Sequence, residues 1–269
     1  MSGIPQPTAG SAALVTGASS GIGKAIATQL AERGHHLVLV ARREDRLREL
    51  ATELATAYGI RAEAAACDLA DAEARATVPA RVSELGLEVE VLVNNAGFGT
   101  AGPFVEQEVE TEIAQLRILC EAVIDLTGRF APAMVERGRG AILTIASSSG
   151  FQPLPNTAGY GAAKAWAMSF SEALHQELRS QGVAVTAACP GPVKTEFFDV
   201  SGPHPAEDFF PKFIHLSAER CAKDALAALD RNQRLVVPGP LPLRAFMHSN
   251  RWAPHPVLLP FLARAFRIR

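Results

Sequence analysis

The chain has 269 residues, of which 48% are hydrophobic and 20% are charged, and its mean hydropathy is +0.11. This composition excludes an intrinsically disordered protein, and no uninterrupted apolar stretch approaches the ~20 residues of a transmembrane helix. None of the 28 acidic residues follows Asp230, whereas seven of the 26 basic residues do. An acidic body of this kind binds nucleic acid poorly, so we expect no nucleic-acid partner.

The first residues and the cysteines bear on the cellular compartment and on metal binding. The start, MSGIPQPTAG, lacks the basic end and the apolar run of a signal peptide, so we expect a cytoplasmic protein. The four cysteines lie far apart and form no Cys-x-x-Cys pair, which argues against a disulfide framework and against structural zinc. The seven histidines also lack metal-ligand spacing, and we expect no metal.

Short apolar segments alternate with segments of helical length along the chain. The apolar segments are non-alternating, which is typical of a parallel sheet covered by helices on both faces. Right-handed crossovers then predict a doubly wound, Rossmann-type α/β sheet in a single domain. The predicted strands are residues 12–16, 36–41, 61–67, 89–93, 141–146, 184–189 and 235–237, and the predicted helices are residues 24–33, 44–58, 113–137, 162–179 and 218–231.

We expect residues 1–237 to form this domain, including a substrate loop at about residues 196–216. The loop holds five Phe residues among Gly, Pro and acids, which indicates a lid over an apolar substrate or, alternatively, a surface hairpin held by buried Phe. Residues 238–269 form a basic, apolar extension. It fits an amphipathic helix at an anionic membrane surface, or a segment packed on the body or on a partner subunit.

Clusters of Gly, Ser and Asn follow four of the predicted strands directly. They are residues 17–23, 94–97, 147–150 and 190–195. In a doubly wound sheet, ligands bind at the carboxyl ends of the strands. Turn chemistry alone would scatter such residues over both ends of the sheet, so this clustering predicts a ligand site.

The segment TGASSGIG, residues 16–23, joins the first predicted strand to the first helix. Its glycines allow a tight turn and close approach of a ligand, and the helix N-terminus offers N–H groups to a pyrophosphate. A P-loop is excluded, because Ala18 and Ala25 stand where that motif needs Gly and Ser or Thr. The spacing Gly-x-x-x-Gly-x-Gly also differs from the usual dinucleotide fingerprint.

Two arginines, Arg42 and Arg43, follow the second predicted strand. An acid there would accept hydrogen bonds from an adenine ribose, whereas guanidinium groups bind a 2′-phosphate through charge-assisted hydrogen bonds. The pair therefore favours NADP(H), with NAD(H) as the other cofactor. The alternative interpretation is that both arginines are solvated residues at a helix start.

Tyr160 and Lys164 lie four residues apart at the start of a predicted helix, so both side chains point to one face. Lowering a Tyr pKa from ~10 to ~7 requires about 4 kcal/mol, which one ammonium at ~4 Å supplies at an effective dielectric of ~20. We therefore expect Lys164 to lower the pKa of Tyr160. The phenol would then give a proton to a carbonyl or take one from an alcohol. A Tyr-x-x-x-Lys spacing alone is common in helices without a catalytic role.

Six motifs together resemble those of the short-chain dehydrogenase/reductase family, in order and spacing, over roughly residues 10–200. The resemblance implies a single-domain Rossmann-type oxidoreductase that uses a nicotinamide cofactor and no metal. The motifs are TGASSGIG (16–23), Asp68, NNAG (94–97), SSS (147–149), YGAAK (160–164) and PGPVKT (190–195).

The resemblance also implies roles for individual residues. Tyr160 matches the catalytic acid/base, and Lys164 matches the residue that holds the nicotinamide ribose and lowers the Tyr pKa. Ser147, thirteen residues before the Tyr, matches the Ser that hydrogen-bonds the substrate oxygen, although the residues alone do not separate it from Ser148 and Ser149. With Arg42 and Arg43, the implied cofactor-binding residues are Gly17, Ser19, Ser20, Gly21, Ile22, Gly23, Asp68, Leu69, Asn94, Ala96, Gly97, Tyr160, Lys164, Pro190, Gly191, Val193 and Thr195.

The chain departs from the family pattern at one position. The family usually places an Asn in the helix before the Ser strand, where it helps to hold a water near the Lys. Residues 115–121 contain no Asn, and Leu119 aligns with that position to within one residue. A main-chain carbonyl would still be able to hold the water.

We expect an NADPH-dependent oxidoreductase of the ketoacyl-reductase type, acting in lipid metabolism. It would interconvert a carbonyl and a secondary alcohol on a small, apolar or 3-oxoacyl-like substrate. The alternatives are an alcohol or hydroxysteroid-type dehydrogenase, and a non-catalytic NADP-binding sensor or scaffold. The resemblance further implies a homodimer or homotetramer, and the basic extension allows peripheral membrane contact.

Overall fold

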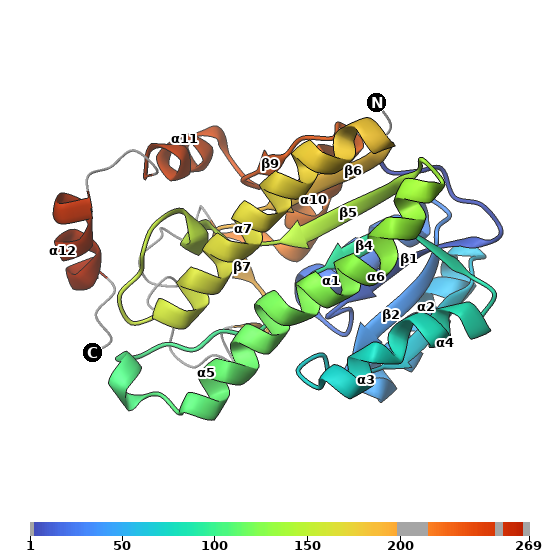
Figure 1. Ribbon diagram of the computed structural model, residues 1–269, viewed down its shortest axis with the longest axis horizontal. Coiled ribbons are helices and arrows are strands. Elements are labelled where there is room, and N and C mark those ends of the chain that lie inside the picture. Colours follow the sequence, from blue (N-terminus) through green and yellow to red (C-terminus); the bar gives the residue numbers. More distant parts are fainter. Residues whose placement is uncertain (1–2, 198–214, 251–254, 266–269) are drawn as a thin grey trace.

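In the part of the chain that the computed structural model describes (residues 3–197, 215–250 and 255–265), seven parallel strands form one sheet (Figure 1). The strand order is β3-β2-β1-β4-β5-β6-β9, so the sheet grows in opposite directions from β1 and β4. The predicted Rossmann-type α/β domain is confirmed. The strands are β1 (Ser11–Thr16), β2 (His36–Ala41), β3 (Ala62–Ala66), β4 (Glu88–Asn94), β5 (Gly140–Ile145), β6 (Val183–Ala188) and β9 (Leu235–Val236).

Helices cover both faces of the sheet, because the strands are apolar on both sides. Ala13 and Val15 of β1 belong to one buried cluster and Ala12 and Leu14 to the other. The first cluster includes residues of α1 (Gly21–Glu32), α2 (Glu44–Tyr58) and α10 (Ala218–Asp230), and the second includes residues of α4 (Val78–Glu84), α6 (Ala122–Glu136) and α7 (Ala158–Leu178).

Three predicted helices have different bounds in the structure. Helix α1 begins at Gly21, three residues earlier than expected, and α7 begins at Ala158, so that Tyr160 lies in its first turn. The helix predicted over residues 113–137 is divided. It consists of α5 (Val109–Leu116), a π-helical segment (Arg117–Glu121) and α6. The spacing of apolar residues does not reveal a single π-helical turn, because the widening of that turn depends on local packing.

The C-terminal segment adds two helices, α11 (Leu241–Asn250) and α12 (His255–Ala265), beyond the carboxyl ends of the strands (Figure 1). Leu243 and Met247 of α11 are buried in a cluster with Phe151 and Met168. Helix α11 therefore packs on the body of the chain.

A short parallel pair, β7 (Val193–Lys194) with β8 (Leu216–Ser217), flanks most of the predicted substrate loop. Residues 198–214 of that loop lie outside the described residues. The other elements are α3 (Ala72–Ala76) and short 3-10 turns at Phe104–Glu106, at Ser148–Phe151 after β5, and at Arg179–Gln181.

Candidate active site

One cavity of about 530 Å³ lies at the carboxyl ends of the strands. Its walls come from the turns after β1 to β6, from α7 and from α11 and α12. Among the site residues predicted from the sequence, Gly23 and Asn94 do not line it. Those that do are Gly17, Ser19, Ser20, Gly21, Ile22, Arg42, Arg43, Asp68, Leu69, Ala96, Gly97, Ser147, Tyr160, Lys164, Pro190, Gly191, Val193 and Thr195.

The turn between β1 and α1 has the form that a bound phosphate requires. Gly17 and Gly21 have φ angles of 64° and 55°, in the left-handed region that disfavours side chains. A Cβ atom at Gly17 would lie 2.7 Å from the side-chain nitrogen of Asn95, and one at Gly23 would collide with the Gly17 carbonyl oxygen. Gly23 thus serves packing, while the N-terminus of α1 offers its N–H groups to the cavity.

The two asparagines of NNAG have different roles. Asn94 is buried, and its side chain donates a hydrogen bond of 3.1 Å to Thr127 Oγ1 of α6, away from the cavity. Asn95 lines the cavity, and its Nδ2 donates to the carbonyl oxygens of Thr16 at 2.8 Å and Gly17 at 3.3 Å. Of the two amide side chains, the one that lines the cavity is therefore that of Asn95, whereas that of Asn94 bonds within the fold. Neighbouring residues of an extended strand point to opposite faces, and the motif alone does not say which faces the ligand.

Arg43 is bonded directly to the phosphate turn. Its Nη2 donates to the Oγ atoms of Ser19 at 2.9 Å and Ser20 at 2.8 Å, and its Nη1 lies 2.7 Å from a carboxylate oxygen of Glu196. Arg42 lines the main cavity and also a second, smaller one formed with residues of the segment 98–111. The two arginines therefore have different surroundings, a distinction that the sequence did not provide.

The loop after β3 is held at the cavity by a buried arginine. Arg75 donates from Nη1 to the carbonyl oxygen of Leu69 at 2.6 Å and from Nε to Asp125 at 2.7 Å. The Arg75 side chain is 3% exposed, so its charge depends on these partners for compensation. Arg75 thereby fixes Asp68 and Leu69 relative to α6.

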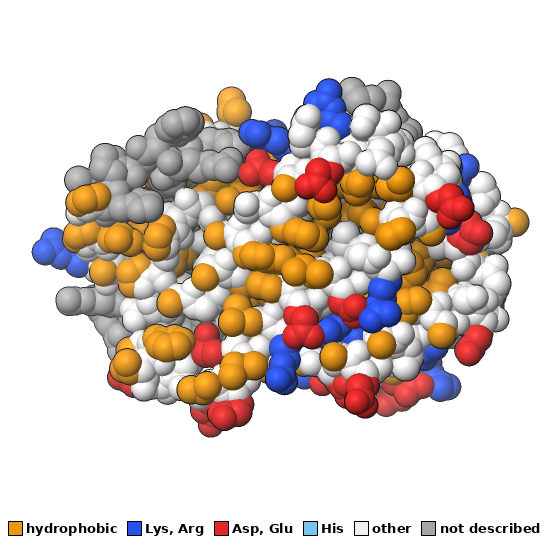
Figure 2. All heavy atoms as spheres, in the orientation of Figure 1, with side chains coloured by type: hydrophobic (Ala, Val, Ile, Leu, Met, Phe, Trp, Pro, Cys, Tyr) orange, Lys and Arg blue, Asp and Glu red, His pale blue; other side chains and the backbone are white. Residues whose placement is uncertain are grey.

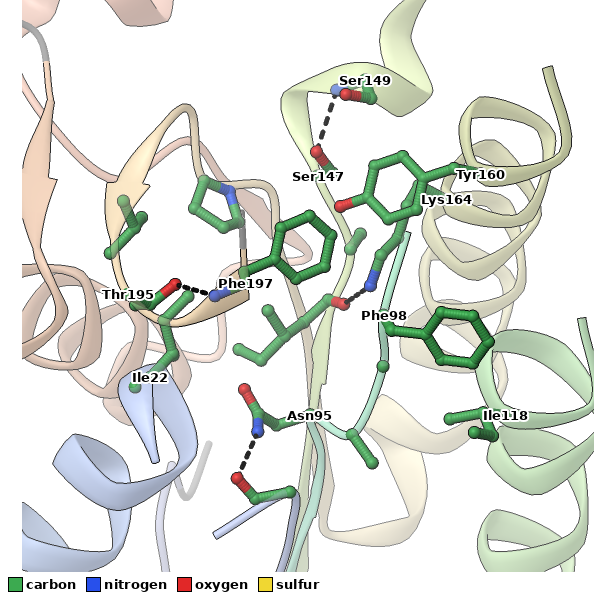
Figure 3. Close-up of a pocket in the computed structure, with 18 of the residues that line it drawn as sticks. Ile22, Asn95, Phe98, Ile118, Ser147, Ser149, Tyr160, Lys164, Thr195 and Phe197 are labelled. Atoms are coloured by element: carbon green, nitrogen blue, oxygen red, sulfur yellow. Dashed lines mark hydrogen bonds between the residues drawn. The ribbon is translucent and has the colours of Figure 1, made fainter. Parts of the chain in front are cut away.

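Ser147, Tyr160 and Lys164 meet at the floor of the cavity, where the hydroxyl of Tyr160 points toward Ser147 (Figure 3). All three are less than a tenth exposed. The Lys164 Nζ lies 5.7 Å from the centroid of the Tyr160 ring and donates a 2.7 Å hydrogen bond to the carbonyl oxygen of Ile145. Ser147 Oγ accepts a 3.1 Å hydrogen bond from the N–H of Ser149, which turns the hydroxyl into the cavity and distinguishes it from its two neighbours.

The pKa values of Tyr160 and Lys164 differ from the sequence expectation. Burial raises the pKa of Tyr160 to about 12, and a hydrogen bond with Ser147 opposes that rise. Burial also lowers the pKa of Lys164 to about 8. The expected lowering of the Tyr160 pKa toward neutrality by Lys164 is not found, because desolvation of the buried phenol dominates.

Leu119 is the residue that the sequence aligned, to within one position, with the Asn of the family pattern. It lies in the π-helical segment, is 2% exposed, and packs so closely on Gly97 that a Cβ atom there would be 2.5 Å from a Leu119 methyl group. That same Cβ position is 4.0 Å from the Lys164 Nζ. An aliphatic side chain thus fills the space beside the lysine, next to a widened helical turn.

The remaining wall of the cavity is apolar. Phe197 packs against Tyr160, with ring centroids 5.6 Å apart, and its ring approaches Gly99. The C-terminal helices supply Phe246 and Met247 from α11 and Leu258 and Leu262 from α12. The arrangement joins a phosphate turn, a Ser-Tyr-Lys cluster and an apolar wall in one space.

Comparison with known proteins decides the family. Residues 11–205 match the family model of the short chain dehydrogenases. The chain belongs to the short-chain dehydrogenase family. It is 35% identical over 201 residues to a very-long-chain 3-oxoacyl-CoA reductase of Bos taurus, an alignment that covers 73% of this chain and 64% of that relative's length.

Solved structures of other short-chain dehydrogenases resemble this one over most of its length. A short-chain dehydrogenase from Sphingobium yanoikuyae in complex with NADPH has a TM-score of 0.80 and 34% identity, covering 92% of this chain and 94% of that one. A bulky-bulky ketone specific alcohol dehydrogenase from Comamonas testosteroni has a TM-score of 0.76 and 28% identity, covering 96% and 94%.

The next two findings on this dehydrogenase concern metal binding and membrane crossing. Within residues 3–197, 215–250 and 255–265, no three His, Cys, Asp or Glu side chains gather in a way that would bind a metal ion. In the same residues, none of the helices has both the length and the hydropathy that crossing a membrane requires.

Sequence reasoning missed several residues that line the cavity of this dehydrogenase. The sequence did indicate the helices α11 and α12, since apolar residues recur there at helical spacing in a segment without acids. Nothing in the sequence placed that segment over the catalytic cluster. Asn95, Ser148, Ser149 and Pro192 also line the cavity and belong to motifs in which they were given no role, and Glu196 and Phe197 begin the predicted substrate loop. The residues missed are Ala41, Cys67, Phe98, Ile118, Ile145, Ala146, Gln152, Leu154, Phe246, Met247, Leu258 and Leu262.

Proposed function

We propose that this dehydrogenase is an NADPH-dependent reductase that converts a ketone on an apolar, acyl-chain-like molecule into a secondary alcohol. One observation carries the proposal. The cluster of Ser147, Tyr160 and Lys164 lies in the same cavity as a phosphate turn at one end and an apolar wall at the other.

The residues at the phosphate turn fit NADPH. The turn has no room for side chains at Gly17, and it places Ser19 and Ser20 beside the guanidinium of Arg43. Hydroxyl and guanidinium donors at a helix N-terminus are the groups that bind phosphate oxygens. The NADPH complex of the relative from Sphingobium yanoikuyae supports the same cofactor class.

Bound NADPH supplies a hydride to the carbonyl carbon. The protein has to hold the carbonyl oxygen and deliver a proton to it. Ser147 is suited to donate a hydrogen bond to that oxygen as negative charge develops there. Tyr160 keeps its proton at neutral pH, since its pKa is raised to about 12, and it is suited to donate that proton when the alcohol forms. Lys164 fixes α7 to the end of β5 and places positive charge near the phenol.

The apolar wall supports a lipid-like substrate. Met247 and Leu262 are 1% and 4% exposed, and both line the cavity. Burying a methylene group against such a wall contributes about 0.8 kcal/mol, so an acyl chain gains affinity with length. The relative from Bos taurus carries the name of a 3-oxoacyl-CoA reductase, which supports a 3-oxoacyl substrate in lipid metabolism.

A second candidate is an alcohol dehydrogenase that acts on ketones with two large substituents. The volume of the cavity, about 530 Å³, and the likeness to the enzyme from Comamonas testosteroni favour this candidate. A panel of 3-oxoacyl thioesters of graded chain length, bulky diaryl ketones and short aldehydes, assayed with NADPH and with NADH, separates the candidates. Turnover that rises with acyl-chain length supports the first proposal. Turnover confined to short aldehydes contradicts both.

A further inference from the structure

Glu196 lines the cavity directly after Thr195, beside the phosphate turn. Its carboxylate is paired with two arginines at the start of α2. Arg43 Nη1 lies 2.7 Å from one carboxylate oxygen, and Arg46 Nη1 lies 2.8 Å and 3.0 Å from the two. These contacts join residues about 150 positions apart in the sequence.

The same arginine reaches the phosphate turn. Arg43 donates to the hydroxyl oxygens of Ser19 and Ser20 while it holds the Glu196 carboxylate. Two guanidinium groups and two hydroxyl groups therefore converge at the N-terminus of α1. Carboxylate and phosphate oxygens accept hydrogen bonds from the same donors, so the position that Glu196 fills is one that a phosphate would also fill.

We propose that Glu196 is a specificity-determining residue for the cofactor: in the free protein its carboxylate occupies the anion position, and a 2′-phosphate binds by displacing it from Arg43 and Arg46. This inference rests on the proposed NADPH-dependent function. It adds a competing anion, supplied by the chain itself, to the binding of that cofactor.

The exchange is physically accessible because the ion pairs are at the surface. The side chains of Glu196, Arg43 and Arg46 are 44%, 43% and 48% exposed, so water and salt screen their attraction. The two arginines hold the pKa of Glu196 below its ordinary value, which keeps the carboxylate ionised at neutral pH. A 2′-phosphate carries more negative charge and more acceptor oxygens than a carboxylate, so it is able to replace it.

The two nicotinamide cofactors differ in this respect. NADPH carries the 2′-phosphate, and NADH has a 2′-hydroxyl in its place. Only the binding of NADPH therefore has to break the pairing of Glu196. Neutralising Glu196 should strengthen the binding of ligands with a 2′-phosphate and leave the others nearly unchanged.

Two fragments test this without any catalysis, adenosine 2′,5′-bisphosphate and adenosine 5′-monophosphate. Their affinities for the full chain are measured by calorimetry in the wild type and in Glu196→Gln, which keeps the shape of the side chain and removes its charge. We expect Glu196→Gln to bind the bisphosphate about fivefold more tightly, and the monophosphate with less than about twofold change, as suits an exposed ion pair. Its affinity for the bisphosphate should also fall more steeply with added salt than that of the wild type, in which one anion replaces another.

Glu44→Gln is the matched control. Glu44 lies next to Arg43 in the chain, is paired with Arg48, and its neutralisation changes the net charge by the same amount. A gain of similar size in Glu44→Gln would show a general charge effect and overturn the proposal. Weaker binding of the bisphosphate in Glu196→Gln would also overturn it, because Glu196 would then support the arginines in the bound state.

The fragments separate this inference from the proposed function. If the wild type binds the bisphosphate more tightly than the monophosphate but Glu196→Gln changes neither affinity, the displacement is wrong and the cofactor proposal stands. If the wild type binds both fragments equally, the 2′-phosphate site itself is wrong and both proposals fail. A thermal unfolding midpoint close to that of the wild type verifies that the variant is folded.

Discussion

The ammonium of Lys164 donates a 2.7 Å hydrogen bond to the carbonyl oxygen of Ile145, the last residue of β5. This bond ties the first turns of α7 to the strand end that leads into Ser147. The position of Tyr160 relative to Ser147 therefore depends on the contact between α7 and β5. The lysine is as much a structural connection as a source of charge.

Tyr160→Phe should abolish most of the reduction. The substitution removes only the proton donor, and general acid catalysis contributes on the order of 10²–10⁴-fold to a rate. We expect kcat to fall by that factor, while the dissociation constant of NADPH, measured by fluorescence, changes less than about twofold. Near wild-type turnover with a ketone would contradict the role given to Tyr160.

The stability of the protein should depend on pH through Lys164. Its pKa is lowered from 10.5 to about 8, so between these values the unfolded chain binds more protons than the folded one. Stability contributed by this group therefore rises as the pH increases from about 8 toward 10.5. Lys164→Met lacks the buried charge. We expect the free energy of unfolding of Lys164→Met to exceed that of the wild type by up to about 3 kcal/mol at pH ~7. The difference should be smaller at pH ~10. Chemical denaturation at both pH values measures this, and a constant difference would argue against it.

Tyr160 should act in the opposite direction at higher pH. Burial raises its pKa from 10.0 to about 12, so the folded protein holds this proton over a range in which the unfolded chain loses it. Its contribution to stability is complete below pH 10 and is lost as the pH rises toward 12. In Tyr160→Phe the loss of stability in that range should be smaller than in the wild type. Equal losses would show that other groups cause it.

The two arginines after β2 should differ in their effect on cofactor choice. Arg43 is bonded to Ser19 and Ser20, so Arg43→Gln should weaken NADPH binding by about tenfold or more, as expected for charge-assisted hydrogen bonds, and NADH binding far less. Arg42→Gln should have the smaller effect of the two. Calorimetry with both cofactors measures these affinities, and equal losses for NADPH and NADH would remove the 2′-phosphate argument.

The C-terminal helices should set the length of the substrate. Leu262→Trp adds bulk to the apolar wall at a residue that is 4% exposed. Each methylene group excluded from the wall costs about 0.8 kcal/mol, so kcat/KM should shift toward shorter chains by about fourfold per carbon. Leu241→Trp is the control, because Leu241 is 75% exposed and does not line the cavity. The same shift in both variants would contradict the assignment of the wall.

An exposed apolar stripe along α5 and α6 should mediate self-association. Figure 2 shows hydrophobic side chains on the face where Figure 1 has these helices, and Val109, Ile113, Leu116 and Ile124 are 41–60% exposed. We expect the subunits of the homodimer or homotetramer implied by the family resemblance to meet at this stripe. The double variant Ile113→Glu/Ile124→Glu should lower the mass measured by light scattering. Val105→Glu, at a residue that is 90% exposed outside the stripe, should not.

The sheet and most of its ligand-binding turns could be predicted because they depend on local patterns. Buried parallel strands are short apolar runs, and the residues that follow them, such as Gly17 and Ser147, meet at one edge whatever the details of packing. The motif order then distinguished Ser147 from its two neighbours, and the structure adds the bond from Ser149 that orients it.

Other features depend on contacts between distant residues, which a single sequence does not reveal. The pairing of Glu196 with Arg43 and the place of Leu262 in the cavity are of this kind. Which of the two side chains, Asn94 or Asn95, faces the cavity depends on which side of the end of β4 meets the turn after β1. The direction of the Tyr160 pKa shift depends on how completely the phenol is desolvated, which the spacing of Tyr160 and Lys164 does not reveal.

Helices α11 and α12 follow the last strand of the sheet and reach the cavity from outside the layers that hold the cofactor turn and the Ser-Tyr-Lys cluster. Their sequence is consequently free to vary while the chemistry stays the same. Exchanging residues 238–269 for the equivalent tail of another family member would change which substrates enter the cavity and leave the Ser-Tyr-Lys cluster unchanged.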